Sequence, residues 1–178
     1  MTTVLAAKDM KGRVVFAWDT QVTSGVRPKN GVEKVFANGP VIFGVSGTVR
    51  TLNVLRYMDV PPRGKGDTRK WIVRALIPAI IKSLKDVDAA LMEDSQANTE
   101  SHVIVAVDDV IGYLGSDLSF VEDEMGLYAV GSGSQFALGA LAADASLGRA
   151  MDVAGALDIY TGTDHHVRTA KRIRKDAK

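Results

Sequence analysis

The residues that could do chemistry begin at Thr2, which would carry two reactive groups once Met1 is removed. Its hydroxyl could act as a nucleophile and its α-amine as a general base, so one residue would hold both groups. An α-amine has an ordinary pKa of about 8, close to neutral pH, whereas a surface lysine titrates at about 10.4. The alternative is that Met-Thr-Thr is an ordinary chain start without a catalytic role.

An aspartate is predicted to lie beside this threonine, because both belong to one hairpin. Apolar, β-branched residues occupy positions 2–7 and 14–18, on either side of a polar turn. If paired positions sum to 21, Thr2 lies opposite Asp19, with Cβ atoms on the order of 5 Å apart. A slip of one position would turn Asp19 to the other face of the sheet.

Composition limits the class of protein. The chain has 178 residues, of which 46% are hydrophobic and 24% charged, which predicts one domain over 1–178. Its formal net charge of +1 gives no argument for a nucleic-acid partner, and the absence of cysteine excludes disulfides, thiolate metal sites and a cysteine nucleophile. Charges interrupt the first residues, and no apolar run is long enough to span a membrane. We therefore expect a soluble cytoplasmic protein.

Strand and helix patterns alternate in two blocks. After the hairpin, strands are predicted at 33–36, 41–45, 103–107, 110–114, 120–122, 128–130 and, as an edge strand, 167–173. Helices are predicted at 48–57, 68–91, 135–147 and 149–161, with a kink at Pro78. Two strand blocks, each followed by two helices, favour an α+β fold. We expect two antiparallel sheets packed face to face with helices outside, a four-layer αββα sandwich.

A family resemblance follows from the order and spacing of six motifs. These are TTVLAAK, FAWDTQVTSG, GVEKV, FGVSGT, YAVGSGSQFALGA and ALDIYTGT. With them the chain resembles the N-terminal nucleophile (Ntn) hydrolases of the proteasome β-subunit superfamily, most of all the HslV-type threonine peptidases. The resemblance implies the Ntn hydrolase fold and cleavage of peptide bonds through an acyl-enzyme on the first threonine.

The resemblance also implies four central roles. Thr2 matches the nucleophile, and Asp19 and Lys34 match a charge pair beside it. Gly47 matches the glycine whose backbone N–H stabilises the oxyanion, a role that Thr48 would share if the alignment shifts by one. The plain alternatives are a turn-capping role for Asp19 and, for Lys34, a role in protecting an edge strand from aggregation.

Two further groups are implied in the same way. The cluster that orients the terminal amine matches Ser132, Asp158 and Thr161. The residues that bind substrate match Thr23, through its backbone, and Val45 and Val49, which would line an apolar specificity pocket. The plain alternatives are a tight turn at the GSGS glycines and a helix-end aspartate at position 158.

Partners and cofactors complete the expectations. No phosphate-binding loop is present, and His102 is distant from the adjacent pair His165 and His166, so neither a cofactor nor a metal is predicted. Family membership implies a homo-oligomeric ring of six or seven subunits, two rings stacked, and an ATP-dependent unfoldase. Two other functions stay open: a non-catalytic structural subunit of such a ring, and an Ntn hydrolase of small amides.

Overall fold

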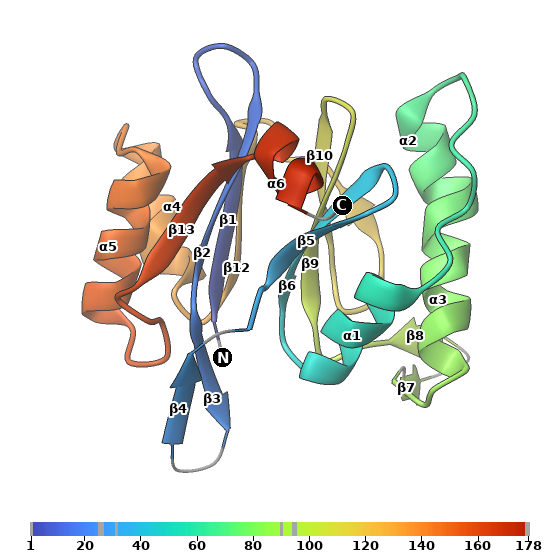
Figure 1. The fold of residues 1–178 in the computed structure, drawn as a ribbon, viewed down its shortest axis with the longest axis horizontal. Helices are drawn as coiled ribbons and strands as arrows, with labels where there is room; N and C mark the ends of the chain where they lie inside the picture. The colour runs from blue at the N-terminus through green and yellow to red at the C-terminus, as the bar shows by residue number, and fades with distance from the viewer. Residues whose placement is uncertain (1, 25–26, 31, 90, 94–95, 177–178) are drawn as a thin grey trace.

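Two antiparallel sheets form the centre of the molecule. The computed structural model describes residues 2–24, 27–30, 32–89, 91–93 and 96–176. One sheet has the order β12 (Leu127–Gly131), β1 (Thr3–Lys8), β2 (Val14–Asp19) and β13 (His165–Thr169). The other has the order β11 (Phe120–Val121), β10 (Val110–Leu114), β9 (His102–Val107), β6 (Val41–Ser46) and β5 (Val35–Asn38). The two sheets lie face to face between helices (Figure 1).

Helices cover the outer face of each sheet. The helical segments are α1 (Val49–Tyr57), α2 (Thr68–Trp71), the π-helical η1 (Ile72–Leu76), α3 (Ile77–Lys85), α4 (Ser134–Ala142), α5 (Leu147–Leu157) and α6 (Ala170–Asp176). One buried apolar cluster joins α1 to α3 with the five-stranded sheet, a second fills the space between the sheets, and a third joins α4 and α5 with the four-stranded sheet. The predicted αββα sandwich of the α+β class is confirmed.

The alternation of side chains along β1 shows how one strand serves two layers. Val4 and Ala6 face the other sheet, whereas Leu5 faces α4 and α5. The sheets approach closely at Gly44, where an added Cβ would lie 2.8 Å from the Val4 side chain and 3.2 Å from Phe16. A larger residue at position 44 would push the two sheets apart.

The register of the first hairpin differs from the prediction by one position. Val4 lies opposite Trp18, so paired positions sum to 22 and not to 21. Asp9 is the cause: its N–H donates to the Arg13 carbonyl at 2.9 Å, and its carboxylate accepts from the N–H groups of Lys11 and Arg13, both at 2.9 Å. Asp9 therefore closes the turn opposite Arg13.

The helix predicted over 68–91 is shorter and irregular. The π turn η1 ends two residues before Pro78, which cannot donate to the carbonyl four residues earlier. The helix ends at Lys85 because Asp88 adopts a φ of +50° and the Ala89 N–H donates back to the Leu84 carbonyl. The residues that follow form the small hairpin β7 (Leu91–Glu93) and β8 (Gln96–Asn98).

Two more segments differ from the prediction near the end of the chain. The stretch 167–173 is not one strand, because β13 ends at Thr169 and α6 begins at once, burying Ile173 against the cluster between the sheets. The predicted fourth helix ends at Leu157, so that Asp158 lies at its C-terminal cap.

A second small hairpin, β3 (Gln21–Ser24) and β4 (Arg27–Asn30), extends from the end of β2. In the described chain no helix has the length and apolarity needed to cross a membrane.

Candidate active site

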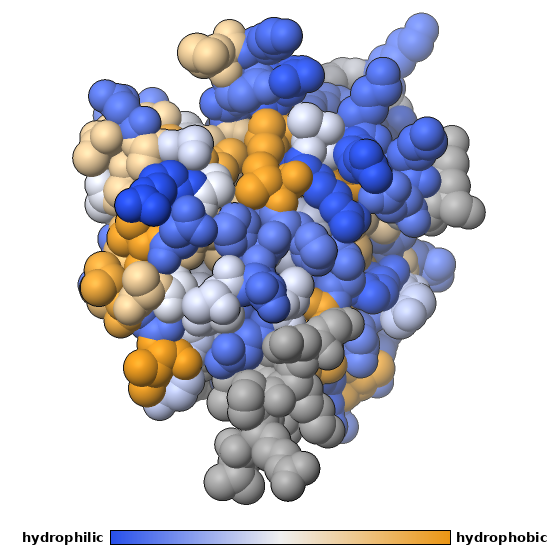
Figure 2. All heavy atoms as spheres, turned by 60° about the vertical axis from the view of Figure 1, so that its left-hand side comes forward, coloured by the Kyte–Doolittle hydropathy of each residue, from blue (hydrophilic) through white to orange (hydrophobic). Residues whose placement is uncertain are grey.

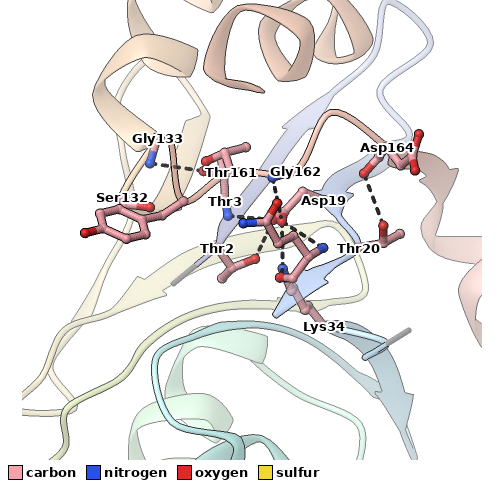
Figure 3. A network of polar contacts seen from close by, with 12 residues as sticks. Thr2, Thr3, Asp19, Thr20, Lys34, Ser132, Gly133, Thr161, Gly162 and Asp164 are labelled. Atoms are coloured by element: carbon pink, nitrogen blue, oxygen red, sulfur yellow. Dashed lines mark hydrogen bonds and ion pairs between the residues drawn. The ribbon is translucent and has the colours of Figure 1, made fainter. Parts of the chain in front are cut away.

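Thr2 and Asp19 meet at the end of the first hairpin. Both are buried, with Asp19 fully inaccessible and Thr2 5% exposed. The Thr2 hydroxyl donates to Asp19 Oδ1 at 2.5 Å, and the Thr3 N–H donates to the same oxygen at 2.8 Å (Figure 3). Although the register places Thr3 opposite Asp19, the carboxylate lies at the last residue of β2 and still reaches the neighbouring threonine.

Lys34 pairs with the other oxygen of the same carboxylate. Its Nζ lies 2.9 Å from Asp19 Oδ2, and its side chain is 4% exposed. The ammonium also donates to the Gln21 carbonyl, and Oδ2 accepts the N–H groups of Gln21 and Gly162, each at 3.1 Å. Asp19 therefore joins the threonine hydroxyl on one side to a buried ammonium on the other.

Burial sets the electrostatics of this pair. Desolvation lowers the pKa of Lys34, while the charge of Asp19 and the hydrogen bond to it act in the opposite direction. A buried charge pair persists only where hydrogen bonds satisfy both groups, and Asp19 accepts four donors besides Lys34. The arrangement holds a fixed positive charge near the Thr2 hydroxyl.

A second polar network is centred on Asp158. Ser132 and Thr161 both donate their hydroxyls to Asp158 Oδ2 at 2.6 Å, and the Tyr160 N–H donates to Oδ1 at 3.2 Å. Burial alone would raise the pKa of Asp158, but the hydrogen bonds from Ser132 and Thr161 outweigh it and lower the pKa below its ordinary value. Asp158 is therefore held as a carboxylate.

This second network joins the start of β1. The Thr3 and Thr161 hydroxyl oxygens are 2.6 Å apart, and the Gly133 N–H donates to the Thr3 hydroxyl at 3.1 Å. The Ser132 N–H donates to the Thr2 carbonyl at 3.1 Å. The backbone of Thr2 is thus fixed by Ser132, while its hydroxyl is fixed by Asp19.

Two glycines allow the backbone to pass close to these residues. At Gly131 φ is +105°, and an added Cβ would lie 1.7 Å from the Thr2 carbonyl oxygen. At Gly47 φ is +134°, and an added Cβ would lie 2.3 Å from Ser101 Oγ, the atom that accepts the Thr48 N–H. Only glycine fits either position without moving the backbone.

Comparison with known proteins identifies the fold. The solved structure of BPH from Thiobacillus denitrificans matches with 22% identity and a TM-score of 0.74, covering 95% of this chain and 97% of that one. A second structure of BPH, in complex with epoxomicin, matches with 21% identity and a TM-score of 0.73, covering 94% and 97%. HslV from Trypanosoma brucei matches with 20% identity and a TM-score of 0.66, covering 94% and 98%. This chain has the Ntn hydrolase fold.

Sequence comparisons add nothing to this result. No protein-family model matches the chain, and the comparison with curated proteins found no match. A mutant of Anbu from Hyphomicrobium sp. strain MC1, with 13% identity and a TM-score of 0.68, covers 95% of this chain and shares the Ntn hydrolase fold. Since these identities are low, the likeness concerns the fold, and the chemistry must be argued from the residues themselves.

Of the predicted substrate residues, Val45 contacts the Asp19 network directly, since its N–H donates to the Lys34 carbonyl at 3.0 Å. Thr23 belongs to β3, where it pairs with Pro28 of β4. Val45 is 2% exposed and packs in the cluster between the five-stranded sheet and its helices, whereas Val49 is 46% exposed in the first turn of α1. Their part in substrate binding stays a prediction.

A cleft of about 940 Å³ opens beside the site. One end is lined by Ser46, Gly47 and Ser132, and the cleft continues along β12 past Leu127. In this Ntn hydrolase fold the ends of β6 and β12 meet there, since an added Cβ at Gly131 would lie 2.9 Å from Ser46 Oγ. Sequence patterns alone gave no indication of this space.

Several residues of the site were missed by sequence reasoning. Thr3, Gly131 and Gly162 hold the networks together, and Ser101 fixes the turn at Gly47. The doubled threonine at the start and the TGT motif were visible signals for Thr3 and Gly162, and the GSGS motif, expected to form a tight turn, was the signal for Gly131. No sequence signal marked Ser101, because its role depends on a contact across two strands.

Within the described ranges no three His, Asp or Glu residues are grouped so that they could hold a metal ion.

Proposed function

We propose that this protein is a threonine-type peptidase whose nucleophile is Thr2, made N-terminal by removal of Met1. The observation that carries the proposal is the buried contact from the Thr2 hydroxyl to Asp19, whose second oxygen pairs with Lys34. A structural subunit would have no need of a buried charge pair at the first threonine, since such a pair contributes little to stability compared with apolar residues of the same volume.

The proposed reaction has two steps on Thr2. In the first, the α-amine, directly or through a water molecule, takes the hydroxyl proton as Oγ attacks the scissile carbonyl; the C–N bond then breaks and the leaving amine receives that proton. In the second, water attacks the resulting ester, which releases the carboxylic acid and regenerates Thr2. Lys34 favours the unprotonated amine and the ionised oxygen through its charge.

Other residues would position these groups. The Gly47 N–H would stabilise the oxyanion of the tetrahedral intermediate. Ser132, Asp158 and Thr161 would orient the freed amine, because Ser132 binds the Thr2 carbonyl and shares the Asp158 carboxylate with Thr161. Substrate before the cut would lie along the backbone of Thr23, near Val45 and Val49.

Assembly is the second part of the proposal. We propose a cytoplasmic homo-oligomer, a ring of six or seven subunits, stacked in two rings and fed with unfolded protein by an ATP-dependent unfoldase. The structural likeness to HslV and BPH supports a ring. The face in Figure 2 is mostly hydrophilic, with hydrophobic residues in separate groups. Exposed apolar residues on and after the outer helices could serve subunit contacts, namely Phe136, Leu157 and Ile159.

The decisive experiment combines N-terminal analysis with labelling. Intact mass of the protein from its native host should show a chain that begins at Thr2. Incubation with epoxomicin, the compound in the solved BPH complex, should add one molecule per chain. Thr2→Ala should abolish labelling and peptide hydrolysis, whereas the control Thr20→Ala, which removes a hydroxyl that donates to the Asp164 carbonyl at 3.4 Å, should retain both. Retained Met1 in most molecules together with no labelling would favour the structural subunit.

Light scattering at micromolar concentration tests the ring. A multiple of the 19.0 kDa chain mass corresponding to six, seven, twelve or fourteen subunits is expected. A stable monomer that cleaves peptides would exclude the ring and favour a hydrolase of small amides.

A further inference from the structure

The outer side of β12 is an unpaired strand edge beside the reaction centre. On one side β12 pairs with β1, from Leu127 opposite Ala7 to Gly131 opposite Thr3. On its other side no strand of the described chain pairs with it, and all five of its residues line the cleft of about 940 Å³. A free strand edge offers a row of backbone donors and acceptors to an extended peptide.

The direction of β12 fixes the direction of such a peptide. β1 lies between β12 and β2, and β3 continues from β2, so the cleft and β3 are on opposite sides of Thr2. If the part of a substrate before the cut lies at β3, the part after the cut enters the cleft at Ser132. From its N-terminal to its C-terminal end, the part of the substrate after the cut leads away from Thr2. β12 leads toward Thr2, because its last residue, Gly131, lies opposite Thr3, so the substrate and β12 are antiparallel.

The charge of the cleft is one-sided. Among the described residues that line the cleft there is no Lys or Arg. Four carboxylates line it, namely Glu100, Glu122, Asp123 and Glu124. Arg69, outside the cleft, pairs with Glu122 at 2.5 Å, and Asp123 accepts the Leu127 N–H at 3.2 Å. For Glu100 and Glu124, both exposed, no such partner is described, so their charges remain available to a bound peptide.

The walls of the cleft also offer apolar surface. Val121 is 52% exposed and Met125 69% exposed, both beside the carboxylates. A lysine or arginine side chain can lay its methylene groups on such surface while its charged end reaches an acid. The His102 ring, hydrogen-bonded to the Tyr113 hydroxyl at 2.7 Å, forms the wall nearer to Ser46.

We propose that this cleft binds the part of a peptide substrate that follows the scissile bond, as an added antiparallel strand on β12, and that it favours Lys and Arg there. The proposal rests on the peptidase function proposed above. Because the Leu127 N–H already donates to Asp123, four residues of β12 remain, and at about 3.4 Å per residue they can pair with about four residues of substrate.

The first test compares quenched fluorescent peptides that share one sequence before the cut. After the cut they carry five residues with two Lys, two Gln or two Glu. An exposed ion pair changes binding affinity by roughly 1.5- to 5-fold. We therefore expect kcat/KM for the Lys peptide to exceed that for the Glu peptide on the order of ten-fold, with the Gln peptide between them. The ratio should shrink toward one at about 1 M salt, where charges more than about 3 Å apart are screened.

A second test concerns the backbone. N-methylation of one amide at a time after the cut should lower kcat/KM by roughly 2- to 12-fold at alternate residues only, because in an antiparallel pair every second residue exchanges hydrogen bonds with the neighbouring strand. Equal effects at all positions, or none, would overturn the strand-pairing proposal.

A charge reversal tests the named acids. The double variant Glu100→Lys/Glu124→Lys should lose or invert the preference for Lys over Glu, while Asp86→Lys, a control at the end of α3 remote from the cleft, should keep it. Thermal unfolding checks that both fold. An unchanged preference in the double variant, or no preference in the wild-type protein, overturns the proposed role of charge. Failure of the peptidase proposal would look different, since then no peptide, nor an aminocoumarin amide without residues after the cut, would be hydrolysed.

Discussion

Replacing Lys34 by Met tests the buried charge pair most directly. Methionine has nearly the length of lysine without its charge, so the substitution leaves Asp19 as a fully inaccessible carboxylate without its ammonium. Removing one partner of a buried pair typically costs 3–5 kcal/mol, since the other charge remains desolvated. Here four other donors still reach Asp19, so we expect a loss near the lower end, about 3 kcal/mol.

Two measurements follow from this variant. Urea unfolding at fixed protein concentration gives the loss of unfolding free energy, and peptide hydrolysis gives the loss of kcat, which we expect to be about a hundred- to thousand-fold. The control Lys82→Met, on an exposed lysine of α3, should change stability by no more than about 0.5 kcal/mol and leave hydrolysis unchanged.

A double-mutant cycle with Asp19→Ala separates the pair from its surroundings. If the charges stabilise each other, the double variant should be less destabilised than the sum of the single variants, with a coupling free energy between about 1 and 3 kcal/mol. Coupling below about 0.5 kcal/mol, or hydrolysis by Lys34→Met at the wild-type rate, would refute the reasoning.

Three other predictions concern the same region. Gly131→Ala should destabilise the fold by about 1–3 kcal/mol and stop hydrolysis, because its Cβ would lie 1.7 Å from the Thr2 carbonyl oxygen. The control Gly139→Ala, at an open position on the surface of α4, should raise the unfolding free energy by up to about 1 kcal/mol, and chemical denaturation compares the two variants. Asp158→Asn should cost about 1–3 kcal/mol at pH 7, and because the folded-state pKa of Asp158 is lowered, this difference should shrink as pH falls below about 3.9 in unfolding measured across pH. Since burial lowers the pKa of Lys34, its charge is lost at a lower pH than that of a free lysine, and the alkaline decline of hydrolysis in a pH–rate profile should have its midpoint below about pH 10.4.

The layers of the fold could be predicted from sequence because they depend on periodicity. Strand residues alternate between two buried faces, and the helices carry one apolar side, so the αββα order follows from the order of the segments. The exact register and helix ends could not be predicted in the same way. They depend on single contacts, such as the Asp9 carboxylate in the turn and the left-handed conformation of Asp88.

The candidate site was predictable to the extent that a family motif marked it. Thr2, Asp19 and Lys34 were expected together and are in contact, and so are Ser132, Asp158 and Thr161. A tight turn was expected at the GSGS glycines, but the steric limit at Gly131 and the role of Ser101 could not be predicted, since they come from contacts across strands that are distant in sequence. The cleft along β12 likewise arises only when the two sheets are brought together.

The Asp19–Lys34 pair joins the two sheets of the fold, which has a consequence for the order in which the site assembles. Asp19 ends a strand of the four-stranded sheet, while Lys34 directly precedes β5 of the five-stranded sheet, so the ion pair spans the boundary between the two halves of the sandwich. A nascent chain with both sheets formed but not yet docked has a threonine hydroxyl without its neighbouring cation. Under the proposed function, docking of the two sheets is therefore the step that brings the Lys34 ammonium to the Asp19–Thr2 pair, and a chain that has not reached it is expected to be inactive.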